Sequence, residues 1–516
     1  MKRVLTGILV LSSALLLASC GDKTTTQKRT TTAQTTTSKK TTAKKTTTKL
    51  STTKMKTTEA PVEYVNRLRF YCYDNELKKI IDKYYPQTDK FDETKTYLHD
   101  GTVIEWIAMP NPTYVKDLET ALETCNVDMF VFQARYAPKY INTDMVVDLE
   151  DTIEDYDISK QFKGIKDLVT YDYDLKGAAW LATPGVTVYN QNVADKVWGE
   201  WDGDTLSKGV TYKFVEECLS TKEKFDSAAA EVNSKGSYML IEPLEWAQLY
   251  FSNLNETMYD DKGTLTTTDD KVTIDQKLID WINDSKYYLN QGLMFSAANE
   301  HVKWGTQWDD TIAGDDWLCL FSPTWMNEWM LKDYRHAADE DPKEMSVREM
   351  KDSKLRLIKS YDSWIDGGTW MGVSDCGIAN STIYDSICSL VKNLTANKDL
   401  QKAIALDSES PVVPNNMEAL YELANDDSLT TSYFGGQNVF EVYAKALLRT
   451  DFSNKSFYDQ TIIENVQAAF LSYLQGDRTA SQAWNDLKNN LHNSLKVGAS
   501  NINLHGSSED IDDYIH

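Results

Sequence analysis

Apolar runs of two different periods alternate along residues 67–133, and this alternation constrains the fold more than any other feature of the sequence. Three runs are short, continuous and β-rich, and the two between them repeat apolar residues at helical spacing. The strand-like runs are RLRFYCY (67–73), GTVIEWIAM (101–109) and DMFVFQ (128–133), and the helix-like runs are DNELKKIIDKYY (74–85) and YVKDLETALE (114–123). The alternation predicts α/β layers on a largely parallel sheet, with ligand sites at the carboxyl ends of the strands.

The far end of the chain has a different pattern. Residues 460–496 carry apolar residues at i, i+3 and i+4 spacing, which predicts a helical C-terminus. About 450 residues follow the leader described below, and a chain of that length is too long to fold around a single hydrophobic core. We therefore expect more than one domain.

The leader begins like a secretory signal peptide. Two basic residues precede a short apolar run from Leu5 to Leu17, which is well below the roughly 20 residues needed to span a bilayer. The run ends in Leu-Ala-Ser-Cys20, which resembles the lipobox of bacterial lipoproteins, where the cysteine is lipidated and becomes the new N-terminus. We expect residues 1–20 to be a lipoprotein signal peptide and Cys20 to carry palmitate and related acyl chains. A plain signal peptide that contains a cysteine is the alternative.

The segment that follows is polar and basic. Residues 21–63 are mostly Thr and Lys and have no apolar face, so we expect a disordered tether. Residues 1–63 hold 12 basic and 3 acidic residues of the chain's 54 and 78, which leaves a net charge of −33 for residues 64–516. An acidic surface of this kind repels nucleic acid and anionic membranes, and it suits a domain that faces outward from the cell.

The residues with special chemistry form no recognisable enzyme or metal motif. The sequence has no H-E-x-x-H, no G-x-S-x-G and no P-loop, and its cysteines match no zinc spacing. We expect no cofactor and no metal. The six cysteines after Cys20 are Cys72, Cys125, Cys218, Cys319, Cys376 and Cys388. Free buried thiols are the favoured state, and one or two disulfides in an exported protein are the alternative, with the pairing left open.

Several segments, in order, resemble the extracellular solute-binding proteins of ABC transporters, in the carbohydrate-binding family 1. The resemblance covers residues 66 to 496. Its segments are NVDMFVFQARYAPKYINTDMVVDLEDTI (126–153), DLKGAAWLATPGVTVYNQNVADK (174–196), GDDWLCLFSPTWMNEW (314–329), GGTWMGVSDCGIANSTIYDSICSLVKNLT (367–395), PVVPNN (411–416), YFGGQNVFEVY (433–443) and YLQGDRTASQAWNDL (473–487). The sequence departs from the family at Trp180, where a tyrosine is often seen.

The resemblance implies a two-lobed, periplasmic-binding-protein-like α/β fold with a hinge and a ligand cleft between the lobes. The chain would cross between lobes near Pro184–Asn190, near Tyr361–Thr369 and after about residue 425. The expected domains are the signal peptide 1–20, the tether 21–63, an N-terminal lobe of 64–183 plus 366–425, a C-terminal lobe of 184–365 plus 426–500, and a tail of 501–516.

A sugar has nonpolar faces that stack on aromatic rings and hydroxyl edges that need acceptors and donors. We expect nine residues to contact it, chosen because they follow strand ends or glycine-rich turns or belong to aromatic and acidic clusters. They are Asp74, Asn75, Glu76, Gln133, Arg135, Trp180, Asp309, Trp325 and Trp370. For Trp325 and Trp370 a core position is the alternative, as a helix N-cap is for Asp74. The weaker tryptophan candidates are Trp304, Trp308 and Trp364.

These patterns lead to one expected function with two alternatives. We expect a monomeric, lipid-anchored receptor on the extracellular face of a bacterial cell membrane. It would capture a sugar or oligosaccharide, deliver it to the permease subunits of an ABC importer, and perform no chemistry on it. The alternatives are a lipid-anchored glycoside hydrolase, for which paired carboxylates are plentiful, and a surface glycan-binding adhesin.

Overall fold

The computed structural model describes residues 66–85, 92–109, 113–259, 270–407, 412–448, 454–505, 511, 514 and 515. The expected signal peptide, the lipidation site Cys20 and the tether lie outside the described residues.

Strands from residues 66–181, together with one strand from residues 369–373, form a six-stranded sheet in the order β2-β3-β1-β4-β15-β7. Its strands are β1 (Asn66–Cys72), β2 (Lys95–Tyr97), β3 (Thr102–Ala108), β4 (Met129–Phe132), β7 (Ala178–Leu181) and β15 (Thr369–Val373). The three predicted strands and the two predicted helices, α1 (Glu76–Tyr84) and α2 (Thr113–Glu123), are confirmed. The expected largely parallel sheet is not: β3, β1 and β4 are parallel, whereas β2, β15 and β7 pair antiparallel.

A second, four-stranded sheet has the order β11-β13-β8-β14. Its strands are β8 (Gly185–Asn190), β11 (Tyr238–Leu240), β13 (Trp317–Pro323) and β14 (Leu355–Ile358). Side chains alternate between the two faces of a strand. In β13, all seven residues from Trp317 to Pro323 are buried, so the side chains on both faces of the strand are covered. This sheet is therefore buried on both faces, which explains its continuous apolar runs.

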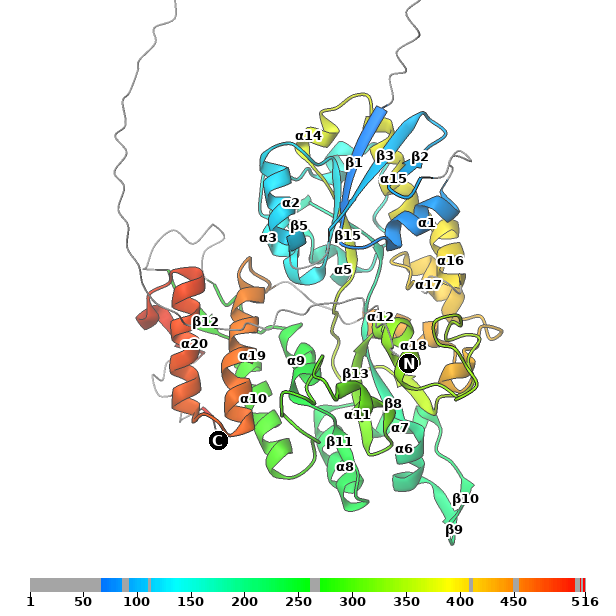
Figure 1. Cartoon of the computed structure of the whole chain (residues 1–516), viewed down its shortest axis with the longest axis vertical. Coiled ribbons are helices and arrows are strands. Elements are labelled where there is room, and N and C mark those ends of the chain that lie inside the picture. Colours follow the sequence, from blue (N-terminus) through cyan, green and yellow to red (C-terminus); the bar gives the residue numbers. More distant parts are fainter. Residues whose placement is uncertain are drawn as a thin grey trace, which may run out of the picture. The chain divides into compact units, whose positions relative to one another are not determined.

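Helices surround both sheets (Figure 1). The longer ones are α6 (Gln191–Trp198), α8 (Lys222–Ser234), α9 (Pro243–Phe251), α10 (Gln276–Asn290), α15 (Tyr384–Ala396), α16 (Lys398–Leu406), α17 (Met417–Ala424), α18 (Val439–Leu447), α19 (Asp459–Gln475) and α20 (Ala480–Leu495). The last two confirm the predicted helical C-terminus. A capping box, in which Thr479 and Gln482 satisfy each other's backbone N–H groups, starts α20. None of the described helices is long and apolar enough to cross a membrane.

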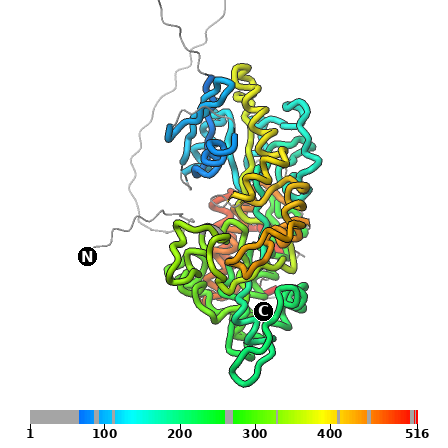
Figure 2. The backbone as a smooth tube through the Cα atoms, turned by 90° about the vertical axis from the view of Figure 1, so that its right-hand side faces the viewer, coloured from blue at the N-terminus to red at the C-terminus, as the bar shows by residue number. Residues whose placement is uncertain are grey.

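Segments distant in sequence meet around the six-stranded sheet. Figure 2 shows the start of the described chain, in blue, beside the yellow helices α15 and α16. The Thr102 and Ser386 hydroxyl oxygens lie 2.6 Å apart and join β3 to α15. The C-terminal part of the sequence is therefore needed to complete the first sheet and its cover.

Two segments connect the sheets and run antiparallel to each other. One joins β7 to β8, and the other joins β14 to β15. Pro184 bridges Ile365, and the Gly185 N–H donates to the Trp364 carbonyl at 2.8 Å. The second segment ends in Gly367 and Gly368, which both have φ near +80°. Consecutive left-handed residues suit glycine, so the sequence DGG marks this turn.

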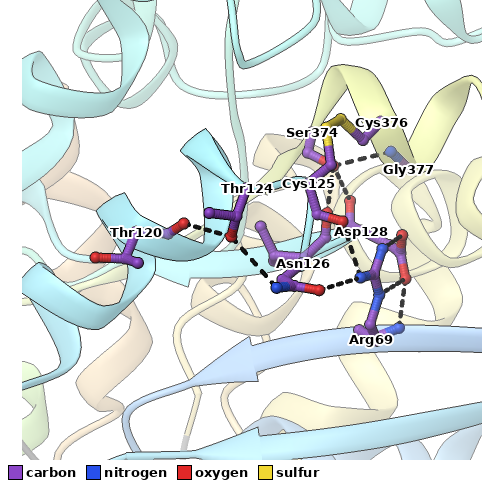
Figure 3. The surroundings of a disulfide bond; sticks show 10 residues. Arg69, Thr120, Thr124, Cys125, Asn126, Asp128, Ser374, Cys376 and Gly377 are labelled. Carbon is purple, nitrogen blue, oxygen red and sulfur yellow. Dashed lines mark hydrogen bonds and ion pairs between the residues drawn. A yellow bond between two sulfur atoms is a disulfide. The ribbon is translucent and has the colours of Figure 1, made fainter. Parts of the chain in front are cut away.

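A disulfide joins Cys125, just after α2, to Cys376 on the short helix α14 (Asp375–Ile378) (Figure 3). Next to it, Arg69 of β1 binds both carboxylate oxygens of buried Asp128, at 3.0 and 2.8 Å. The other four described cysteines are free. Most of the six cysteines are therefore free thiols. The structure identifies Cys125 and Cys376 as the disulfide pair, which the sequence left open.

Candidate functional site

The carboxyl end of β1 carries a short run of polar residues, Asp74–Glu76, which we call the acidic turn. The Asp74 carboxylate accepts a hydrogen bond from the Glu76 N–H at 2.9 Å, so it contributes to starting α1. Asn75 occupies the N-cap position but makes no side-chain cap bond. Asp74 and Asn75 are exposed and Glu76 is half-buried.

The acidic turn has unusual electrostatics for a surface. Desolvation by the surrounding protein, followed by the nearby charge of Asp74, raises the pKa of Glu76 to about 8. Desolvation also raises the pKa of Asp74, although its side chain reaches water. Neither carboxylate forms an ion pair within the described part of the chain. At neutral pH the Glu76 carboxyl group is therefore largely protonated and can donate a hydrogen bond beside Asp74.

The carboxyl end of β4 lies next to this turn. Gln133 follows the strand, is half-buried, and lines a small hollow walled mainly by tyrosines. The hollow is lined by Tyr73, Tyr114, Phe132, Gln133, Tyr136 and Tyr140. The buried Tyr140 hydroxyl has no hydrogen-bond partner there, whereas Tyr73 donates to the Gly368 carbonyl at 3.1 Å. Tyr73 thus links the carboxyl end of β1 to the Gly367–Gly368 turn.

Three residues from different parts of the chain meet at Asp366, and we call Arg135, Lys303, Trp325 and Asp366 the hinge cluster. The Arg135 guanidinium lies 3.3 Å from one carboxylate oxygen of Asp366, and the Lys303 ammonium lies 3.6 Å from the other. The indole N–H of Trp325 donates to the Asp366 carbonyl at 3.2 Å. Arg135 follows β4 of the first sheet and Trp325 follows β13 of the second, so the cluster joins both sheets through the segment that connects them.

The hinge cluster surrounds one carboxylate with two cations. Burial alone would raise the pKa of Asp366, but Lys303 and Arg135 hold it below the ordinary value. Burial likewise opposes the charge of Arg135, but the Asp366 carboxylate, together with smaller contributions from Tyr136, Glu464 and Tyr73, raises its pKa. A buried carboxylate with two cations is stable only as a set, because removal of one partner leaves an uncompensated charge.

Two tryptophans, Trp304 and Trp325, lie next to Lys303. Trp325 is half-buried and Trp304 is 37% exposed. Their ring centroids are 6.3 Å apart and their planes differ by 7°. The Lys303 ammonium lies 5.9 Å from the Trp304 ring centre and 5.7 Å from that of Trp325. Indoles of this kind can stack on the nonpolar face of a sugar or another flat group.

A buried pair of acids, Glu242 and Glu245, lies close to Lys303. Glu242 caps α9 by accepting the N–H groups of Leu244 and Glu245 at 2.6 and 2.7 Å. Burial is the main cause that raises the pKa of both carboxyls, and for Glu245 the second cause is the charge of Glu242. One Glu245 oxygen has no hydrogen-bond partner. The pair is therefore protonated more readily than ordinary glutamates.

The structure places three of the expected residues away from these groups. Trp180 and Trp370 are fully buried, in β7 and β15. Trp370 stacks on Phe132 and donates to the Ile165 carbonyl at 3.3 Å, so the core covers its ring in this structure. Asp309 is half-buried in the first turn of α11 (Trp308–Ala313), where it accepts a hydrogen bond from the Asp310 N–H.

Tyr73, Lys303 and Asp366 were not among the residues predicted from the sequence, and Trp304 was predicted only as a weaker candidate. Asp366 precedes the Gly367–Gly368 turn, so the DGG motif could have identified it. Lys303 and Trp304 lie in the loop before α11, with no strand end to mark them. Among the described residues, no group of three or more metal-ligating side chains is arranged to hold a metal ion.

No protein-family model matches the chain, and no curated protein matches its sequence. Solved structures do share its fold. A family 1 extracellular solute-binding protein matches with a TM-score of 0.64 and 15% identity, over 83% of this chain and 100% of its own. The sugar-binding protein MalE from Xanthomonas citri matches at 0.56 and 12%, over 84% and 98%. The galacto-N-biose-/lacto-N-biose I-binding protein of a Bifidobacterium longum ABC transporter, in complex with lacto-N-biose, matches at 0.55 and 14%, over 84% and 97%. The chain has the two-lobed fold of these proteins, which confirms the predicted fold.

Proposed function

We propose that this protein captures a sugar, in particular an oligosaccharide, and delivers it to the permease subunits of an ABC importer. One observation carries the proposal. In a fold shared with sugar-binding proteins, Arg135 at the carboxyl end of β4 and the Trp325 indole beyond β13 both bind Asp366, on the segment that joins the two sheets.

The chemistry of these residues suits a polyhydroxylated ligand. Asp74 supplies a carboxylate, Glu76 a protonated carboxyl, and Gln133 an amide, which together accept and donate hydrogen bonds. A charge-assisted bond to a carboxylate is about twice as strong as a neutral one. Trp325 offers an aromatic ring from the other sheet. A ligand that contacts both lobes binds the closed state more tightly than the open state, so its binding would favour closure of the lobes.

We further propose that the protein is held on the extracellular face of the membrane by a lipid on Cys20. The support comes from the leader sequence, whose apolar run ends in a lipobox-like motif. Each buried CH₂ of an acyl chain contributes about 0.8 kcal/mol, so more than one chain gives stable anchoring. Mass spectrometry of the detergent-extracted protein tests this: a diacyl or triacyl mass on the Cys20 peptide is expected, and Cys20→Ala should release the protein into the medium.

A glycoside hydrolase is the second candidate, and the raised pKa of Glu76 is the observation that favours it. A general acid for glycoside cleavage needs a carboxyl that stays protonated near neutral pH, beside a second carboxylate. Incubation with labelled oligosaccharides separates the two functions. An unchanged substrate after prolonged incubation is expected for a transporter receptor, and product formation would contradict it.

Thermal-shift screening against a glycan panel is the primary test. A sugar present at 100 times its Kd should add about 2.7 kcal/mol to the free energy of unfolding. Trp325→Ala should remove most of the shift, whereas the matched control Trp201→Ala, an exposed indole in the β9 (Glu200–Asp202) hairpin, should keep it. An adhesin would bind without contraction, so the radius of gyration by small-angle scattering distinguishes it from a closing receptor.

A further inference from the structure

We infer that residues 345–350, which we call the strap, hold the two lobes together away from the segments that join the two sheets, and so limit how far the lobes open. The strap belongs to the part of the chain between β13 and β14 of the second sheet, yet it binds a helix that packs beside the first sheet. The inference goes beyond the proposed function, because it concerns the protein with or without a ligand. Three observations carry it: the contacts of Arg348, the position of α16, and the attachment of the strap to the second lobe.

Arg348 binds the end of α16 with both arms of its guanidinium group. One terminal nitrogen donates to the Leu406 carbonyl and the other donates to the Ala405 carbonyl, each at 2.6 Å. The last four carbonyl groups of a helix have no partner within the helix, and a cation placed there also complements the helix dipole. Arg348 therefore satisfies the C-terminus of α16 from a distant part of the sequence, through charge-assisted bonds that are stronger than neutral ones.

The helix α16 belongs to the lobe of the first sheet. It packs against α1, which follows β1, and against α15, which itself packs against β7. Figure 1 shows α1, α15 and α16 close together beside the first sheet. Arg348 also contacts the other lobe, because its guanidinium lies 5.7 Å from the ring centre of Phe440 in α18. Since α18 packs against β8 and β14 of the second sheet, Arg348 lies between elements of both lobes.

The strap itself is attached to the second lobe. The Lys332 ammonium, in the short helix α13 (Lys332–Tyr334) that follows β13, donates to the Met345 carbonyl at 2.8 Å. Val347 and Met350 are buried and belong to the hydrophobic cluster. A segment held in this way cannot follow α16 outward without losing hydrogen bonds or exposing apolar side chains to water.

These contacts make opening of the lobes more costly. A movement that separates α16 from α18 has to break both Arg348 bonds and leave carbonyl groups at the end of α16 short of partners. Ile404 and Ala405 are buried there, so water does not replace Arg348 freely. From the strength of hydrogen bonds to charged groups, loss of this pair should raise the population of the open state about tenfold.

Distances between the lobes of the ligand-free protein test the inference. Nitroxide labels introduced through unnatural amino acids at Lys116 of α2 and Ala230 of α8, which are both exposed, leave the native cysteines unchanged. Pulsed electron paramagnetic resonance then measures the distribution of distances between the labels. In Arg348→Ala this distribution should extend to longer distances, with an open population about tenfold that of the parent. Arg348→Lys keeps the charge but has no planar fork to reach both carbonyls, so its distribution should be intermediate.

Arg335→Ala is the matched control. Arg335 also caps carbonyl groups, at 2.6 Å from that of Gly314, and it binds the Asp315 carboxylate at 2.8 Å, but these partners directly precede β13. The control should keep the parent distribution. If Arg348→Ala folds and also keeps that distribution, the strap does not limit opening and the inference is overturned. If Arg348→Ala does not fold, a parent distribution in Arg348→Lys overturns it instead. No sugar is added, so failure of the proposed sugar binding would leave either result unchanged.

Discussion

Glu76 shows how a single carboxyl makes the protein sensitive to pH. Its pKa is raised to about 8 in the folded protein, from an ordinary value of 4.5. Between these values the folded state holds a proton that the unfolded state has released, so the stability falls as the pH rises through this window. Below pH 4.5 Glu76 is protonated in both the folded and the unfolded state, so it no longer makes the stability depend on pH. The free energy of unfolding should therefore decrease from pH 5 to pH 9 more in the parent than in Glu76→Gln.

Urea denaturation at pH 5, 7 and 9 measures this difference. Glu217→Gln is the matched control, because Glu217 is exposed and its bond to Lys224 lowers its pKa. The contribution of Glu217 to the free energy of unfolding is lost only as the pH falls through its lowered pKa. Between pH 5 and 9 the stability of Glu217→Gln should therefore change with pH in the same way as that of the parent. A pH profile of Glu76→Gln identical to that of the parent would show that Glu76 is ionised at neutral pH.

Trp325 and Trp370 test the distinction between a site residue and a core residue. Trp370 is fully buried and stacked on Phe132, so Trp370→Ala should lower the free energy of unfolding by about 3–5 kcal/mol. Trp325 is half-buried, so Trp325→Ala should mainly weaken sugar binding. Chemical denaturation together with calorimetric titration checks both effects, and the reverse pattern would exchange the two roles.

The sequence identified both tryptophans but could not separate them. Each follows a strand end or a glycine turn, which is the correct general position for a ligand contact. Trp370, however, lies within β15, directly opposite Phe132 of β4, and both faces of this sheet are covered. A strand that is buried on both faces shows no alternation of apolar and polar residues, so its sequence does not tell which side chains are exposed. Only the pairing of β15 with β4 reveals that Trp370 is buried.

At the scale of elements, the disulfide between Cys125 and Cys376 connects the end of α2 to the start of α14 across 251 residues of sequence. A crosslink over so long a loop restricts the unfolded chain, and its removal typically costs about 2–5 kcal/mol. Cys376→Ser should lower the free energy of unfolding by that amount. Cys218→Ser, which changes a free and half-buried cysteine, is the control and should have little effect.

The glycine turn before β15 offers a second test. Gly367 has φ of +80° and an added Cβ would lie 2.9 Å from the indole nitrogen of Trp325. Gly436 has the same φ but open space around it. Gly436→Ala should therefore cost only the conformational term, about 1 kcal/mol, whereas Gly367→Ala should cost more and weaken sugar binding by displacing Trp325. Equal losses of stability and equal affinities in the two variants would show that the contact with Trp325 has no role.

The elements themselves were predictable where local periodicity decides them. The strands β1, β3 and β4 and the helices α1 and α2 lie within two residues of their predicted bounds, because each has a clear period of 2 or 3.6 or a continuous apolar run. The short strand β2 was missed. The antiparallel flanks of the first sheet were also missed, since strands that are far apart in sequence pair there, and no local pattern records such pairing.

At the scale of the whole molecule, the hinge cluster links both sheets through one carboxylate. Asp366 is 7% exposed and faces Arg135 and Lys303 at once. Because the pKa of Asp366 is held low, the ion pairs should persist across the neutral range. We expect a ligand that brings the lobes together to add contacts around this same carboxylate, so that local binding and global closure would depend on the same group.

Asp366→Asn tests this dependence. The variant keeps the size of the side chain but leaves Arg135 and Lys303 without a shared counter-charge, so closure should become less favourable and sugar affinity should fall by about tenfold or more. Small-angle scattering should show the parent contracting when a bound sugar such as maltotriose or lacto-N-biose is added, and the variant contracting less at the same concentration. Asp352→Asn is the matched control, because Asp352 is a more exposed carboxylate than Asp366 and pairs with Arg356, 2.7 Å away, outside the cluster. If Asp366→Asn contracted and bound sugar like the control, closure would not depend on this carboxylate.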